Sequence, residues 1–102
     1  MQKVIVMYRL KPGLMERYRK WSQEVDQKIT PRQPGVKDFQ VFEIKGKTKG
    51  NVDCQIVEVI DVDSYDDWEK ALQSEGMKKV ETEFPNYVDM NSLIVVYGDR
   101  ID

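Results

Sequence analysis

Four runs of apolar and β-branched residues lie along the chain, and each has the length of a β-strand. They cover residues 3–10, 36–44, 54–62 and 93–97. Lys11-Pro12-Gly13 ends the first run as a turn, and the lysine- and glycine-rich segment 45–51 separates the second and third runs as a hairpin loop. The first and third runs are apolar at nearly every position, which predicts central strands that are buried on both faces.

Two helical regions are expected between these strands. Apolar residues recur at steps of three and four from Leu14 to Ile29, which predicts an amphipathic helix, and the two prolines of segment 30–35 end it. Ser64 begins a second helix as an N-cap, and the apolar positions of segment 77–84 predict a further short helical stretch. The predicted order is therefore β-α-β-β-α-β.

This order is typical of an α+β, ferredoxin-like sandwich formed by residues 1–102 as a single domain. We expect a four-stranded antiparallel sheet with both helices on one face and the second and fourth strands at its edges. The right-handed crossover is expected to place the first and third strands side by side and parallel. The uncovered face would carry apolar side chains from all four strands. We therefore expect a homodimer that packs sheet against sheet as a dimeric α/β barrel.

Composition and charge exclude several classes of partner. Hydrophobic residues make up 40% of the chain and charged residues 33%, with a formal net charge of −2, as in ordinary globular proteins. The absence of a basic block argues against a nucleic-acid or anionic-membrane partner. No run approaches the roughly 18 apolar residues of a membrane span, and no signal-peptide stretch opens the chain. We expect a cytoplasmic protein.

The residue types that are missing limit the possible chemistry. The chain has no histidine, which removes the usual general base and the commonest metal ligand. Its single cysteine, Cys54, cannot form an internal disulfide or a cysteine-rich zinc site, and is expected to be a small buried residue of the third strand. Catalytic triads of the Ser/His/Asp or Cys/His kind are excluded. We therefore expect no metal site and no requirement for a cofactor.

Glu58 is the strongest candidate for catalysis, because it interrupts the apolar run of a strand that should be central. A carboxyl group there would be partly desolvated, which raises its pKa and suits it to general acid or base work. The alternative is a side chain that reaches a polar partner or solvent at the end of the barrel. Asp26 is poorly placed for the helix dipole near the end of the first helix. It either has a polar partner, and is then a candidate for substrate binding, or has no special role.

Other candidates would position a ligand. Arg9, at the end of the first strand, either holds an anionic or enolic oxygen or pairs with a nearby carboxylate. Tyr8 and Tyr97 could donate hydrogen bonds to a substrate carbonyl, although core packing is an alternative for both. Trp21 and Trp68 belong to a generous set of aromatic residues. That set either lines a pocket between helices and sheet or fills a solid core.

The sequence resembles the dimeric α/β-barrel superfamily, and within it the small RedY/HapK-like proteins of prodiginine pigment biosynthesis. The similarity spans segments 4–13, 21–26 and 57–62, and in the tail Phe84, residues 88–89 and 97–101. It implies a protein that binds a flat aromatic or pyrrole-type intermediate, with cofactor-free acid/base or oxygenase/cyclase-type chemistry. Relatives that depend on a histidine, including haem-degrading enzymes, are poor guides to this chain. A non-catalytic ligand carrier, or a dimeric scaffold for a larger enzyme, is the alternative.

Overall fold

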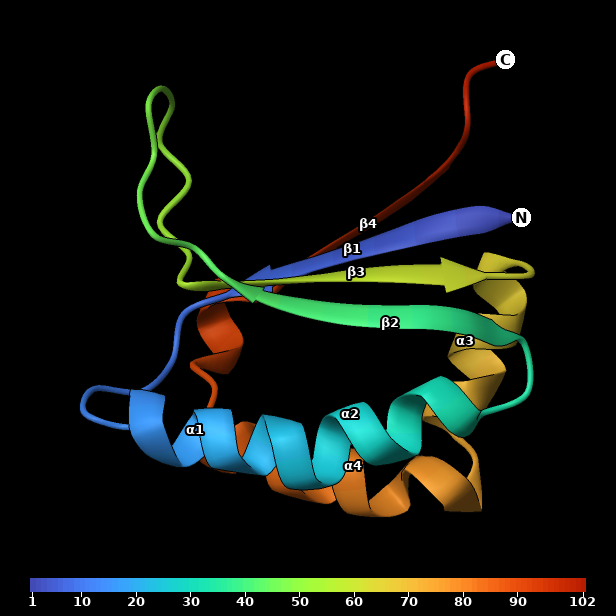
Figure 1. Ribbon diagram of the computed structural model, residues 1–102, viewed down its shortest axis with the longest axis horizontal. Coiled ribbons are helices and arrows are strands. Elements are labelled where there is room, and N and C mark those ends of the chain that lie inside the picture. The colour runs from blue at the N-terminus through green and yellow to red at the C-terminus, as the bar shows by residue number, and fades with distance from the viewer.

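The computed structural model describes residues 1–102 and has two layers, a sheet and a set of helices on one of its faces (Figure 1). The strands are β1 (Gln2–Tyr8), β2 (Val36–Glu43), β3 (Ile56–Val62) and β4 (Ile94–Asp99). The α-helices are α1 (Met15–Trp21), α2 (Gln27–Ile29), α3 (Tyr65–Leu72) and α4 (Lys78–Glu83). Short 3-10 turns adjoin them at η2 (Thr30–Arg32), η3 (Glu75–Met77) and η4 (Phe84–Asn86), and a separate one, η5 (Met90–Ser92), precedes β4.

The strand order is β2-β3-β1-β4, and every neighbouring pair is antiparallel. The predicted antiparallel sheet with β2 and β4 at its edges is confirmed. The prediction that the first and third strands run parallel is wrong. The helical crossover from β1 leads to β2, so these two strands share a direction without touching. The hairpin loop of residues 44–55 then reverses the chain and inserts β3 between them, antiparallel to both.

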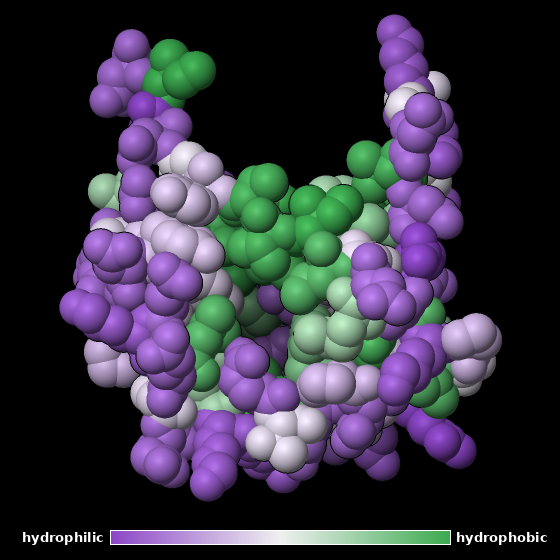
Figure 2. Space-filling model, turned by 180° about the vertical axis from the view of Figure 1, so that it is seen from behind, coloured by the Kyte–Doolittle hydropathy of each residue, from purple (hydrophilic) through white to green (hydrophobic).

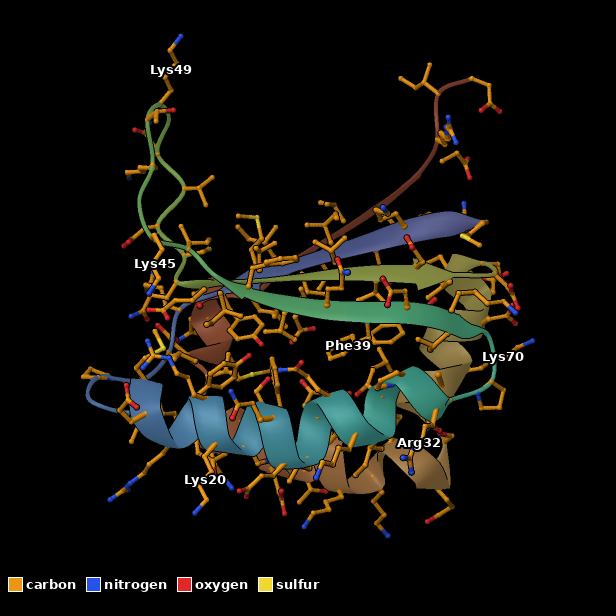
Figure 3. The ribbon with its side chains drawn as sticks, viewed as in Figure 1. Lys20, Arg32, Phe39, Lys45, Lys49 and Lys70 are labelled. Carbon is orange, nitrogen blue, oxygen red and sulfur yellow. The ribbon has the colours of Figure 1, made fainter.

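Alternate residues of the central strands face the helices. On β3 the side chains of Ile56, Glu58, Ile60 and Val62 are buried on that side, as the two-residue period of a strand requires. They join residues of β1, β2 and the helices in one core. Figure 3 shows Phe39 of β2 in the space between the sheet and the helices, whereas Lys20, Arg32 and Lys70 point outward.

The predicted first helix is continuous in direction but irregular in winding. Between α1 and α2 lies the π-helical turn η1 (Ser22–Asp26). The predicted cap of the later helix is confirmed, since the backbone N–H of Asp67 donates to Ser64 Oγ at 3.1 Å. β3 begins at Ile56, so Cys54 lies half-buried in the preceding loop and not in the strand as predicted.

The second face of the sheet has no helix over it (Figure 1). Three large apolar side chains that point to this side are well exposed, namely Phe42 at 48%, Ile94 at 41% and Val96 at 53%. The hairpin of residues 44–55 and the C-terminal tail both extend beyond this face. None of the helices is long and apolar enough to pass through a membrane.

Candidate functional site

A cavity of about 200 Å³ lies between the sheet and the helix layer. Figure 2 shows a hollow near the centre of this face, with hydrophobic side chains above and beside it and hydrophilic side chains inside and below it. Eleven of the fourteen residues that line the cavity are hydrophobic, and the other three are Asp26, Glu58 and Glu81. A largely apolar cavity with a few convergent polar groups is the usual form of a small-molecule site.

Glu58 lies at the centre of the sheet and is only 5% exposed. Its place in the alternation of β3 turns its side chain toward the helices and into the cavity. The hydroxyl of Tyr8, a buried residue of β1, donates a hydrogen bond to Glu58 Oε2 at 2.5 Å. Because Val6 is the residue paired with Glu58 across the strands, Tyr8 is its diagonal neighbour, within reach of a long side chain.

The Tyr8 hydroxyl also forms a hydrogen bond of 2.6 Å with the hydroxyl of Tyr18 on α1. Both phenols are buried, and burial together with the Glu58 charge raises the pKa of each well above its usual range. They therefore stay protonated and can act as hydrogen-bond donors. Tyr18 also lines a second hollow of about 150 Å³ beside α1. The hydrogen-bonded chain Glu58–Tyr8–Tyr18 therefore runs from the central cavity to this second hollow.

Asp26 enters the cavity from the π-helical turn and is 2% exposed. The hydroxyl of Thr30 donates to Asp26 Oδ1 at 2.6 Å, which is the polar partner that its sequence position suggested. Tyr18, Ser22, Asp26 and Thr30 are all buried at steps of four residues. In a regular α-helix such a row drifts by about 40° per step. The wider turn at η1 keeps these residues on the side that faces the sheet.

Burial changes the acidity of all three carboxyl groups of the cavity. Desolvation, helped by the nearby charge of Asp26, raises the pKa of Glu58 to about 8, although the Tyr8 hydrogen bond opposes this. Desolvation raises the pKa of Asp26 to about 6, against the effect of the Thr30 hydrogen bond. Burial also raises the pKa of Glu81. Burial therefore favours the protonated form of Glu58 more strongly than that of Asp26. Two carboxyl groups that ionise at different pH suit an acid and a base in one site.

The walls of the cavity include the aromatic side chains of Phe39, Tyr65, Trp68 and Phe84. Trp68, a candidate from the sequence, is therefore in the site together with Glu58 and Asp26. Tyr97 is 55% exposed and does not line the cavity. It stacks on Tyr65 with ring centroids 4.0 Å apart, and so supports one wall from outside.

Two other candidates lie elsewhere. Arg9 forms ion pairs with Asp89 at 3.0 Å and Asp53 at 3.6 Å, outside the cavity lining. Trp21 is part of the core, and its indole N–H donates to Glu83 Oε1 at 2.8 Å while its ring stacks on a neighbouring tyrosine. Neither residue touches the cavity.

The sequence analysis missed Glu81 and the role of Tyr18. Glu81 follows Met77 by four residues and precedes Phe84 by three, so it lies beside the apolar stripe of its helix. That spacing was the signal in the sequence that could have placed Glu81 near the cavity. Tyr18 was interpreted only as an apolar member of its stripe, because nothing in the linear sequence places its hydroxyl beside Tyr8.

Fold and site together define a ferredoxin-like α+β protein with an acidic, aromatic-walled cavity between its two layers. A family model described as REDY-like protein HapK matches residues 2–101, and the chain belongs to this family. The resemblance found in the sequence is thereby confirmed. A search of curated protein sequences finds no match.

Solved structures support the fold. HapK from Hahella chejuensis superposes with a TM-score of 0.81 at 19% sequence identity, over 99% of this chain and 93% of that chain. A dimeric ferredoxin-like protein from Thermobifida fusca gives a TM-score of 0.76 at 13% identity, over 97% and 90% of the two chains. A putative antibiotic biosynthesis monooxygenase from Nitrosomonas europaea gives a TM-score of 0.76 at 12% identity, over the whole of both chains.

Proposed function

We propose that this chain is a cytoplasmic, homodimeric protein of secondary-metabolite biosynthesis, of the prodiginine-like kind. Its cavity binds a flat aromatic or pyrrole-type intermediate, and Glu58 transfers a proton to or from it. The observation that carries the proposal is the Glu58 carboxyl group, buried at the base of an aromatic-walled cavity and held by Tyr8. Membership of the REDY-like HapK family and the fold of biosynthetic relatives support the pathway assignment.

The proposed chemistry rests on the two buried carboxyl groups of the cavity. A protonated Glu58 can donate to a developing oxyanion or leaving group, while an ionised Asp26 accepts a proton from another position of the same ligand. Tyr8 holds the Glu58 side chain in place through its hydrogen bond. Such a pair suits proton transfer, dehydration or condensation, and aromatic walls would orient a planar ring between the two groups.

The homodimer is proposed from the uncovered face of the sheet. Phe42, Ile94 and Val96 leave an apolar surface there that a second copy can cover, sheet against sheet. The dimeric ferredoxin-like protein from Thermobifida fusca shares this fold. The cavity lies on the opposite side of the sheet, so each protomer would carry its own site.

The test is turnover of a real intermediate. Deleting the gene in its host and identifying the compounds that accumulate by mass spectrometry gives candidate substrates. The purified protein should convert one of them, and Glu58→Gln should abolish conversion while fold and oligomeric state are retained. Glu24→Gln is the matched control, since it removes a carboxylate from an exposed position of the π-helical turn. Full activity of Glu58→Gln would contradict the catalytic role of Glu58.

A non-catalytic carrier or scaffold is the second candidate, and one observation favours it. The cavity volume of about 200 Å³ is below the roughly 300 Å³ at which drug-sized ligand sites begin. In that case Glu58→Gln would leave pathway flux unchanged, whereas substitutions on the protein's surface would reduce it by disturbing contact with a larger enzyme.

A further inference from the structure

The charges around the cavity have one sign. Its lining contains the carboxyl groups of Asp26, Glu58 and Glu81, but no lysine or arginine. Three different elements supply them: the π-helical turn, β3 and α4. Other acids near these elements form ion pairs, such as Glu83 with Lys79 and Glu43 with Arg19. The three cavity carboxyl groups have no such partner in any ion pair of the chain.

Two of these groups present an oxygen to the cavity. Glu58 Oε2 accepts from Tyr8 and Asp26 Oδ1 accepts from Thr30, which leaves Glu58 Oε1 and Asp26 Oδ2 without a protein donor. Every side-chain oxygen that is fully buried in this structure has a hydrogen-bond partner. The two free oxygens therefore reach open space, and both residues line the cavity.

We infer that the cavity selects a planar, nitrogen-containing cation, whose N–H groups donate to the free oxygens of Asp26 and Glu58. This inference deepens the proposed function, on which it rests, by assigning the charge and the donor pattern of the ligand. Protonated imines, amidines and pyrrole-derived cations all belong to this class. Anionic ligands such as carboxylates or phosphates are excluded, because no positive group in the lining could offset a second negative charge.

The walls favour an organic cation over a metal ion. Trp68 and the neighbouring aromatic rings of the lining can attract a cation through their π-systems and can pack against a flat ring. The acidic side chains of the chain form no group of three or more that is arranged to hold a metal ion. A charged N–H donor facing a carboxylate in a largely apolar cavity forms a strong hydrogen bond.

Binding such a cation changes the protonation of the site. The Tyr8 and Tyr18 hydroxyl groups, Asp26, Glu81 and the Tyr65 phenol are the titratable groups around Glu58. None of them is positive, so an entering cation stabilises the ionised form of Glu58 and releases its proton; toward such a ligand Glu58 acts as the base of the proposed proton transfer and not as the acid. Because burial holds the pKa of Glu58 at about 8, affinity for the cation should increase as the pH rises toward and through this value.

Three probes of similar size and different charge test the inference on the full-length wild-type protein: benzamidinium, benzyl alcohol and benzoate. Benzamidinium should bind about tenfold to a hundredfold more tightly than benzyl alcohol, the usual range for hydrogen bonds to charged groups. Benzoate should bind more weakly than both. The chain has two tryptophans, and only Trp68 lines the cavity. In NMR titrations the Trp68 indole resonance should therefore shift, while that of Trp21 serves as an internal reference.

Isosteric variants locate the effect. Asp26→Asn and Glu58→Gln should each weaken benzamidinium binding about tenfold or more and leave benzyl alcohol binding unchanged, whereas Glu24→Gln should change neither. Equal binding of benzamidinium and benzyl alcohol would overturn the inference while preserving an aromatic cavity. Failure of all three probes to shift Trp68 would contradict both the inference and the proposed function. The comparison of probes on the wild type holds even if a variant does not fold.

Discussion

Tyr8 and Glu58 are diagonal neighbours on the two central strands, joined by a hydrogen bond of 2.5 Å from the phenol to the carboxyl group. Both side chains are buried, Tyr8 completely and Glu58 with 5% of its surface exposed, and the same phenol meets Tyr18 on its other side. The pair therefore fixes the orientation of the carboxyl group before any ligand arrives. Placing a reactive group in advance in this way lowers the cost of reaching the productive geometry.

Tyr8→Phe should raise the pKa of Glu58 above its value of about 8, because the lost hydrogen bond lowers that pKa in the wild type. It should also reduce the free energy of unfolding by about 1–2 kcal/mol, the usual cost of leaving a buried polar group without its partner. The pKa can be followed by ¹³C NMR of the glutamate carboxyl carbon, and stability by urea denaturation. Tyr18→Phe is the control, since it leaves the bond to Glu58 intact. A lower Glu58 pKa in Tyr8→Phe would contradict the arrangement described.

Stability should depend on pH in a way that Glu58 controls. Its pKa is raised in the folded state from an ordinary value of 4.5 to about 8, so the folded protein holds this proton more tightly than the unfolded chain. The resulting stabilisation is complete below about pH 4.5 and is lost as the pH rises to about 8. The free energy of unfolding should therefore differ between the two ends of this pH window by on the order of a few kcal/mol.

Chemical denaturation at several pH values measures this dependence. In Glu58→Gln the decline of unfolding free energy between pH 5 and 8 should be much smaller than in the wild type, whereas Glu24→Gln should follow the wild type. Parallel curves for wild type and Glu58→Gln would show that the carboxyl group is not titrated as described.

Thr30→Val removes the donor to Asp26 at nearly constant volume. The pKa of Asp26 should rise above its value of about 6, since the hydrogen bond from Thr30 lowers it. Asp26 then ionises, and can act as a base toward a bound ligand, only at a higher pH than in the wild type, so the activity profile should shift to higher pH. Thr48→Val, in the exposed hairpin loop, is the matched control. An unchanged profile and an unchanged Asp26 pKa would contradict the role of this bond.

The open face of the sheet should be a dimer interface. Val96→Asp places a charge among the exposed apolar side chains and should produce a monomer, because burying an unpaired carboxylate costs several kcal/mol. Multi-angle light scattering at micromolar concentration gives the mass directly. Gln23→Asp, on the exposed side of the π-helical turn, should remain dimeric. A wild-type protein that is already monomeric would contradict the dimer.

Much of the fold could be predicted because the strands and helices have clear periodic patterns. Ser64 signalled its helix start, and Glu58 stood out as an acid that interrupts the apolar run of a central strand. The direction of β3 was misjudged, because a crossover fixes the relation of β1 to the strand that follows it, and not to a strand inserted later. Local patterns carry no information about such insertions.

The site was only partly predictable, since it depends on contacts between distant elements. Glu58 and Asp26 were found as polar residues in unexpected places, but nothing local showed that they share a cavity. Glu81 belongs to a helix more than fifty residues from Asp26 along the chain. Trp21 and Trp68 look alike in sequence, and only the packing of their helices separates a core residue from a cavity wall.

Because residues 22–26 form a π-helical turn, the number of residues in this segment, more than their identity, decides which way the following side chains point. Each residue of an α-helix turns the chain by about 100°. A one-residue deletion here would restore regular winding and rotate the following helix, carrying Asp26 and Thr30 off the side that faces Glu58. Alignments with relatives at 19% identity therefore need a gap allowed at this position before their residues are equated with Asp26. An engineer who transfers this helix to another scaffold must copy its extra residue as well as its side chains.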